Sequence, residues 1–123
     1  MPVQADFWGD IGVSDIRSPV SILREQAALL GSKTQNLLEA QVETTTAGYS
    51  NTFTHSSKLL VPTLDYAYQL FRVTHGVDMY PVEVTNPYVA LSDEAQFRDW
   101  LRERLSSAET KRIIHNLLSQ VAS

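Results

Sequence analysis

Hydrophobic residues recur at helical spacing where the folded part of the chain begins. The stripe consists of Ile22, Leu23, Ala27 and Leu30. Ser18 can accept a hydrogen bond from an unpaired N–H, and Pro19 suits the first helical position because it loses no bond there. Gly31 is a common residue just beyond a helix end. The pattern predicts a helix over residues 19–31, preceded by an N-terminal arm, residues 1–17, that has no sustained period.

The segment 34–44 fits two patterns. Its apolar residues could continue a helix, or they could alternate as in a strand. Three consecutive β-branched residues, Thr44–Thr46, disfavour a helix interior, and residues 48–51 are typical of a turn. We therefore expect a strand from about residue 38, paired as a hairpin with the alternating segment 52–60.

The strongest strand pattern covers residues 64–73. One side carries Leu64, Tyr66, Tyr68 and Leu70, and the other carries Ala67, Phe71 and Val73. Apolar groups on both sides are typical of an inner strand that is covered on both faces. A fourth strand is expected over residues 80–84. It contains Pro81, which cannot donate to a sheet ladder and therefore indicates an edge strand or an irregular start.

Two further helices are predicted after the strands. Ser92 can cap a helix over residues 93–105, and Ser106 with Glu109 three residues later forms a capping box that opens the last helix. The apolar face of that helix consists of Ile113, Ile114, Leu117, Leu118 and Val121. The order predicts an α+β fold with an N-terminal helix, a four-stranded antiparallel meander and two C-terminal helices. These elements form a single domain over residues 18–123.

Composition narrows the choice of partners and location. The chain has 123 residues, and its 10 basic and 14 acidic residues give a net charge of −4. Nucleic acid is therefore a disfavoured partner, because affinity for it depends on a basic surface. No apolar run approaches the roughly 20 residues of a membrane span, and the acidic start is unlike a signal peptide. The sequence has no Cys, which fits a reducing compartment. We expect a cytoplasmic protein without membrane contact.

The histidines are the first candidates for chemistry. The sequence contains His55, His75 and His115, and no two of them have the spacing of a helical zinc site. A metal site would therefore need His55 and His75 to lie together on neighbouring strands, with Asp65 or Asp78 as a further ligand. The sequence also lacks a GxSxG elbow and glycine-rich phosphate loops. We expect the histidines at surface or rim positions of the fold, and we expect no catalytic residue, no metal and no cofactor. The alternative is a small hydrolase or nuclease whose site consists of His55, His75 and nearby acidic residues.

Basic residues gather in the predicted C-terminal helices. Arg98 and Arg102 lie four residues apart, and Lys111 and Arg112 follow beyond the helix junction. Interleaved acids such as Asp99 favour ordinary solubilising ion pairs on a polar helix face. The other interpretation is a contact with an anionic partner, made by Arg98, Arg102, Lys111 and Arg112 together.

Aromatic residues give the leading functional hypothesis. Phe7 and Trp8 stand outside any periodic element, and Tyr66 and Tyr68 share one side of an inner strand. If the three helices cover one sheet face, such residues remain for a partner; if they cover both faces, the chain is a monomer with core tyrosines. We expect a non-catalytic module that self-associates as a homodimer or binds another protein, through Phe7, Trp8, Tyr66 and Tyr68.

Overall fold

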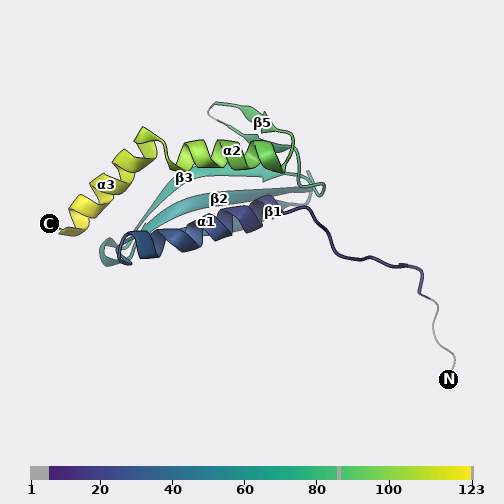
Figure 1. Ribbon diagram of the computed structural model, residues 1–123, viewed down its shortest axis with the longest axis horizontal. Helices are drawn as coiled ribbons and strands as arrows, with labels where there is room; N and C mark the ends of the chain where they lie inside the picture. Colours follow the sequence, from purple (N-terminus) through teal and green to yellow (C-terminus); the bar gives the residue numbers. More distant parts are fainter. Residues whose placement is uncertain (1–5, 86, 123) are drawn as a thin grey trace, which may run out of the picture.

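A computed structural model describes residues 6–85 and 87–122 of the chain (Figure 1). Its elements are α1 (Pro19–Lys33), β1 (Glu39–Ala47), β2 (Thr52–Val61), the 3-10 helix η1 (Pro62–Leu64), β3 (Tyr66–His75), β4 (Val82–Val84), β5 (Val89–Leu91), α2 (Glu94–Leu105) and α3 (Ala108–Ala122). The strands form one antiparallel sheet in the order β1-β2-β3-β4-β5. The α+β class, the meander and the three helices are therefore confirmed.

The predicted number of four strands is wrong, because a fifth strand, β5, follows β4. Each of these two strands has only three residues, and Val82 pairs with Leu91. Three residues are too few to establish an alternating pattern, so the sequence did not reveal β5. Pro81 lies just before β4, and β5 forms that edge of the sheet.

The ambiguous segment 34–44 is a strand from Glu39 onward, as expected. The helix before it runs two residues beyond Gly31, to Lys33. Thr34 then holds the junction, because its buried Oγ1 donates to the Leu30 carbonyl at 3.0 Å and accepts from the Leu38 N–H at 3.2 Å. The side chain thus replaces bonds that the ending helix no longer supplies.

The helix caps follow the expected chemistry with two shifts of one residue. Ser18 caps α1 as predicted. Asp93, not Ser92, caps α2 by accepting from the Gln96 N–H at 2.9 Å. Ser107, not Ser106, accepts from the N–H three residues on, that of Thr110, at the start of α3. Ser106 instead donates to a carbonyl of α2 and belongs to the end of that helix.

All three helices pack on the same face of the sheet, and α1 and α2 lie side by side in front of it in Figure 1. One buried cluster joins α1 and α2 to the strands: Ile22, Leu23, Phe71, Val73, Val82, Val84, Leu91, Phe97 and Leu101. A second joins α3 to β2: Leu38, Leu59, Val61 and Leu117. Among the described residues no helix covers the opposite face, which is polar along β1 and β2. Of the two arrangements that the sequence leaves open, the structure has the one in which the helices cover a single face, although the two-sided pattern of β3 is typical of the other.

A β-bulge in β3 explains the misleading pattern. Ser57 pairs with Phe71, but the next residue of β2, Lys58, pairs with Gln69, so Leu70 has no partner across the ladder. The extra residue shifts the alternation by one position. As a result Tyr68 and Leu70 face the helices together with Phe71, although they have opposite parity in the sequence. The side chain of Arg104 donates to the Leu70 carbonyl at 3.0 Å and satisfies this unpaired group.

The described part of the arm, residues 6–17, extends away from the domain (Figure 1); residues 1–5 of the predicted arm lie outside the described part of the chain. Its base is fixed, because the Tyr80 hydroxyl donates to the Arg17 carbonyl at 3.0 Å and the Arg17 N–H donates to Glu94 at 3.1 Å. The Arg17 guanidinium also pairs with Glu25. Within residues 6–85 and 87–122, none of the helices has the length and apolar composition that crossing a bilayer requires.

Candidate functional site

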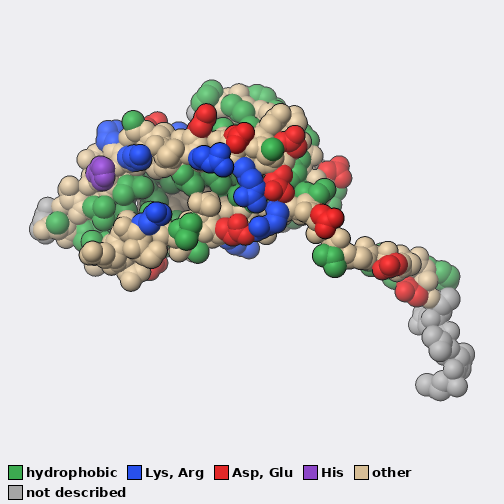
Figure 2. Space-filling view, viewed as in Figure 1, with side chains coloured by type: hydrophobic (Ala, Val, Ile, Leu, Met, Phe, Trp, Pro, Cys, Tyr) green, Lys and Arg blue, Asp and Glu red, His purple; other side chains and the backbone are tan. Residues whose placement is uncertain are grey.

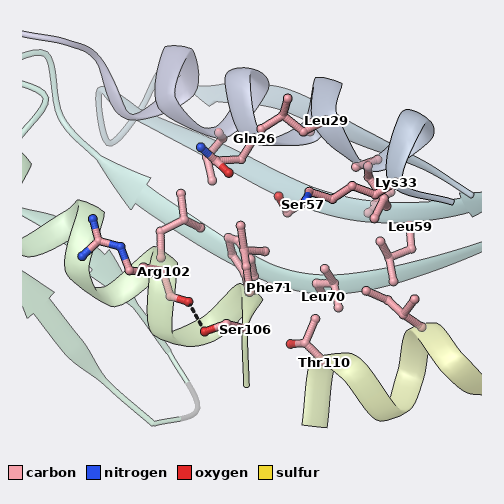
Figure 3. Close-up of a pocket in the computed structure, with 18 of the residues that line it drawn as sticks. Gln26, Leu29, Lys33, Ser57, Leu59, Leu70, Phe71, Arg102, Ser106 and Thr110 are labelled. Carbon is pink, nitrogen blue, oxygen red and sulfur yellow. Dashed lines mark hydrogen bonds between the residues drawn. The ribbon is translucent and has the colours of Figure 1, made fainter. Parts of the chain in front are cut away.

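A groove with a volume of about 510 Å³ lies over the sheet, between α1 on one side and α2 and α3 on the other. Figure 3 shows Leu59, Leu70 and Phe71 projecting from β2 and β3 into this space. The bulge places two adjacent residues, Leu70 and Phe71, on the same side, which a regular strand does not do. The floor of the groove is therefore apolar.

The groove exists because α1 and α2 touch at only one end. Near the start of α1, Ile22 and Leu23 are buried in a shared cluster with Phe97 and Leu101 of α2. Two turns later, Leu29 of α1 also lines the groove but remains 49% exposed. The apolar stripe of α1 thus continues past the point where α2 can cover it.

Basic side chains surround the apolar floor, and Figure 2 shows Lys and Arg on both sides of a hydrophobic hollow. The basic side chains of this lining are those of Lys33, Arg98, Arg102 and Lys111. Lys58 also borders the groove, but it alternates with Ser57 and Leu59 in β2, and its side chain pairs with Glu43 on the opposite face of the sheet. No Asp or Glu of the described residues lines the groove. An apolar side chain bound there would therefore have a positive surface around it.

Part of this positive charge is already paired outside the groove. Arg98 bonds to Glu94 at 2.8 Å, and this bond lowers the pKa of the Glu94 carboxyl, as does the hydrogen bond from the Arg17 N–H. Arg102 lies 3.4 Å from Asp99 and Lys58 lies 2.8 Å from Glu43. Within residues 6–85 and 87–122, Lys33 and Lys111 make no such ion pair.

The predicted anionic-partner residues are partly brought together. Arg98, Arg102 and Lys111 line the groove, while Arg112 is an exposed residue of α3 outside its lining. The solubilising interpretation also has support, since Arg98 and Arg102 form the expected pairs within α2. Sequence reasoning did not identify Lys33 on the opposite wall, because no sequence spacing links α1 to α3.

The four predicted partner-binding aromatics do not form one surface. Phe7 and Trp8 are 95% and 83% exposed on the arm. Tyr66 is 47% exposed, and Tyr68 packs against the cluster around Leu59 on the helix-covered face. The ten-residue length of β3 separates these tyrosines from the end of the strand near the base of the arm.

The structure does bring His55 of β2 and His75 of β3 together. Their Nε2 atoms are 2.7 Å apart, and both side chains are buried, with exposed fractions of 2% and 8%. The Thr44 hydroxyl lies 2.9 Å from His55 Nδ1, and the Gly76 carbonyl lies 2.7 Å from His75 Nδ1. Surface positions were expected for these two histidines, and that expectation is wrong; His115 is exposed on α3.

These contacts determine where the protons lie. A carbonyl oxygen only accepts, so His75 Nδ1 carries a proton and, in the neutral ring, His75 Nε2 accepts from His55 Nε2–H. His55 Nδ1 then accepts from the hydroxyl of Thr44. Burial lowers the pKa of His55 to about 4, helped by the nearby His75 and Arg24. When both rings are neutral, each ring lone pair is therefore already engaged.

Acidic residues do not complete a site around this pair. The small hollow beside it is lined by Ser18, Val20, Arg24, Thr44, Phe53, His55, His75, Val77 and Met79. The residues that the structure describes contain no group of three or more His, Asp or Glu side chains placed to hold a metal ion. Asp65 lies at the opposite end of β3 from His75, and Asp78 does not line the hollow. Within the described part of the chain, the partners that a two-histidine metal site would need are thus not beside the pair.

The groove and the histidine pair use the same sheet face in different ways. The groove presents unfilled apolar surface with surplus positive charge, whereas the histidine pair has its polar atoms bonded within the chain. Binding chemistry is therefore concentrated in the groove. Comparison with known proteins finds no family model, no curated sequence and no solved structure that matches this chain.

Proposed function

We propose that this chain is a non-catalytic protein-binding module whose groove receives an apolar segment that also carries acidic residues. The observation that carries the proposal is the lining of the groove: an apolar floor, four basic side chains and, among the described residues, no acidic one. Such a site matches a peptide that places bulky apolar side chains between carboxylates.

The two parts of the lining have separate physical roles. Apolar burial supplies roughly 25 cal/mol for each Å² removed from water, so the apolar lining that the fold leaves exposed or half-buried, such as Leu29, Leu70 and Ile114, accounts for affinity. The charged rim attracts and orients an acidic segment and disfavours a basic one. The volume of about 510 Å³ falls in the range of sites that enclose a ligand's anchor side chains.

Other partners fit this lining less well. A nucleic acid backbone would satisfy the basic rim but leave the apolar floor exposed, and the chain as a whole carries a net charge of −4. A hydrolase or nuclease site at His55 and His75 has the two histidines in contact, but their lone pairs are engaged and no acidic side chain of the described residues lines that hollow. The cytoplasmic location expected from the cysteine-free sequence forms part of the proposal.

A random peptide library selected on the full chain tests this proposal. We expect enriched peptides to combine two or more bulky apolar residues with Asp or Glu, and we expect the variant Lys33→Glu/Lys111→Glu to lose at least tenfold in affinity for them. The control Arg72→Glu/Arg112→Glu changes the net charge equally, at exposed positions outside the groove lining. Enrichment of basic peptides, or equal binding by both variants, would contradict the proposed site.

A further inference from the structure

The chain itself contains a segment with the chemistry that the groove requires. Residues 6–16 of the arm include five exposed apolar side chains: Phe7, Trp8, Ile11, Val13 and Ile16. Three aspartates are spaced among them: Asp6, Asp10 and Asp15. Residues 6–16 contain no Lys or Arg, so this part of the arm has a net charge of −3. Figure 2 shows this alternation of hydrophobic and acidic side chains along the arm.

We propose that the arm of one copy occupies the groove of a second copy, and that the reciprocal contact forms a two-fold homodimer. This inference rests on the proposed function, because it uses the same groove. Phe7 and Trp8 would cover the apolar floor, and the aspartates would face Lys33 and Lys111. The negative arm would then face the positive rim of the groove, which is the electrostatic complementarity typical of a specific interface.

The base of the arm favours a second copy over the arm's own groove. Both backbone polar groups of Arg17 are bonded to the domain, by Glu94 and Tyr80. The next residue, Ser18, is extended (φ −71°, ψ 151°), as is usual before a proline. The arm therefore leaves the domain in a fixed direction, on the side away from α3 (Figure 1), which contributes to the groove lining. Folding back would require a reversal at the residues that these bonds hold.

The length of the arm and the surface area that it can bury are both sufficient for two copies to place their arms in each other's grooves. Eleven extended residues span roughly 36 Å, whereas the 15-residue helix α1, which forms one wall, is roughly 22 Å long. Aromatic side chains bury about 150–250 Å² each, so two arms with two aromatics each remove about 600–1,000 Å². With the three smaller apolar residues and the matching groove surface, the contact reaches the roughly 1,200–2,000 Å² of a stable interface.

The full chain tests the inference through its mass in solution. We expect a dimer by light scattering or sedimentation at micromolar concentration, and a monomer for Phe7→Ser/Trp8→Ser and for Lys33→Glu/Lys111→Glu. Two controls should remain dimeric: Tyr49→Ser/Tyr88→Ser removes exposed aromatics elsewhere, and Arg72→Glu/Arg112→Glu reverses charges outside the groove. Circular dichroism and melting curves verify that each variant is folded.

Mixing the two monomeric variants then tests directly whether the arm of one copy enters the groove of another. One variant retains an intact groove and the other an intact arm, so the mixture should form a heterodimer at a concentration where neither forms a dimer alone. A monomeric parent would overturn the inference, whether Trp8 is exposed or buried in the chain's own groove. A dimer that both variants retain would also overturn it. Peptide binding to the groove in those cases would leave the proposed function standing.

Discussion

The two hollows on the helix-covered face of the sheet differ in what they leave unsatisfied. Beside the histidines, Thr44, His55, His75 and the Gly76 carbonyl form a closed series of hydrogen bonds. Toward α3, the groove exposes apolar carbon and two lysines without an ion pair among the described residues. Titratable side chains such as these histidines are natural candidates for a functional site. A partner gains more binding free energy, however, from apolar surface and charges that the fold itself leaves without partners.

The largest expected effect is a loss of the packing that supports the groove. Leu117 of α3 is buried with Leu38, Leu59 and Val61, so Leu117→Ala should lower the free energy of unfolding by about 2–5 kcal/mol. Urea denaturation measures this change. The control Leu37→Ala removes an exposed leucine and should cost far less. Equal effects at the two positions would mean that α3 is an appendage to the groove and not part of its support.

The histidine hollow should respond to pH, in contrast to the groove. The pKa of His55 is about 4 in the fold and about 6.5 in the unfolded chain, so the unfolded state binds more protons between these values. Its contribution is therefore complete above pH 6.5 and is lost as the pH falls. Between pH 7 and pH 5 we expect the free energy of unfolding to drop by about 2 kcal/mol.

The variant His55→Gln sharpens this test, because it removes the titrating group and retains a polar side chain. Its unfolding free energy should vary much less between pH 7 and pH 5 than that of the parent chain. Peptide binding to the groove should be unchanged by the substitution, since His55 does not line it. An identical pH profile for parent and variant would show that His55 is not the responsible group.

Removing the hydrogen bond that Arg104 donates to the bulge in β3 should have a smaller effect on the free energy of unfolding. In Arg104→Met the hydrophobic stem remains, but the donor to the Leu70 carbonyl is lost. We expect a decrease of about 1 kcal/mol in the free energy of unfolding, the usual contribution of a hydrogen bond of this kind. Arg112→Met, on an exposed part of α3, is the control. A matching small change in both variants would mean that the bulge is stable without Arg104.

No measurable effect is expected from metal ions. The histidine nitrogens are engaged with each other and with Thr44 and Gly76, so a chelator should leave the melting temperature unchanged. Elemental analysis should find no stoichiometric zinc, manganese or nickel in the purified chain. About one metal ion per chain, lost in His55→Ala or His75→Ala, would favour the hydrolase or nuclease hypothesis over the binding module.

The fold was largely predictable because its elements carry strong local signals. Ser18 and Pro19 mark the start of α1, the β-branched Thr44–Thr46 settles β1 as a strand, and the apolar spacing defines α3. The three-residue β5 has no such signal. The two-sided pattern of β3 was misleading, since an unpaired residue in the ladder is a property of strand register and not of composition.

The candidate site was predictable only in part. Arg98, Arg102 and Lys111 were recognised because they lie close together in the sequence. Lys33 and Leu59 come from other elements, and only the packing of α1 and β2 places them around the same space. The contact between His55 and His75 likewise depends on the pairing of Phe53 with His75 across two strands.

The unpaired Leu70 also has a consequence for how this chain can change over generations. Deleting that one codon would make Gln69 and Phe71 adjacent, so both would keep their partners in β2 and regular alternation would return without a change of face. The losses would be the Leu70 side chain in the groove and the carbonyl to which Arg104 donates. Related chains should therefore tolerate a one-residue difference in length at this position, and those without the extra residue should have a less apolar groove floor.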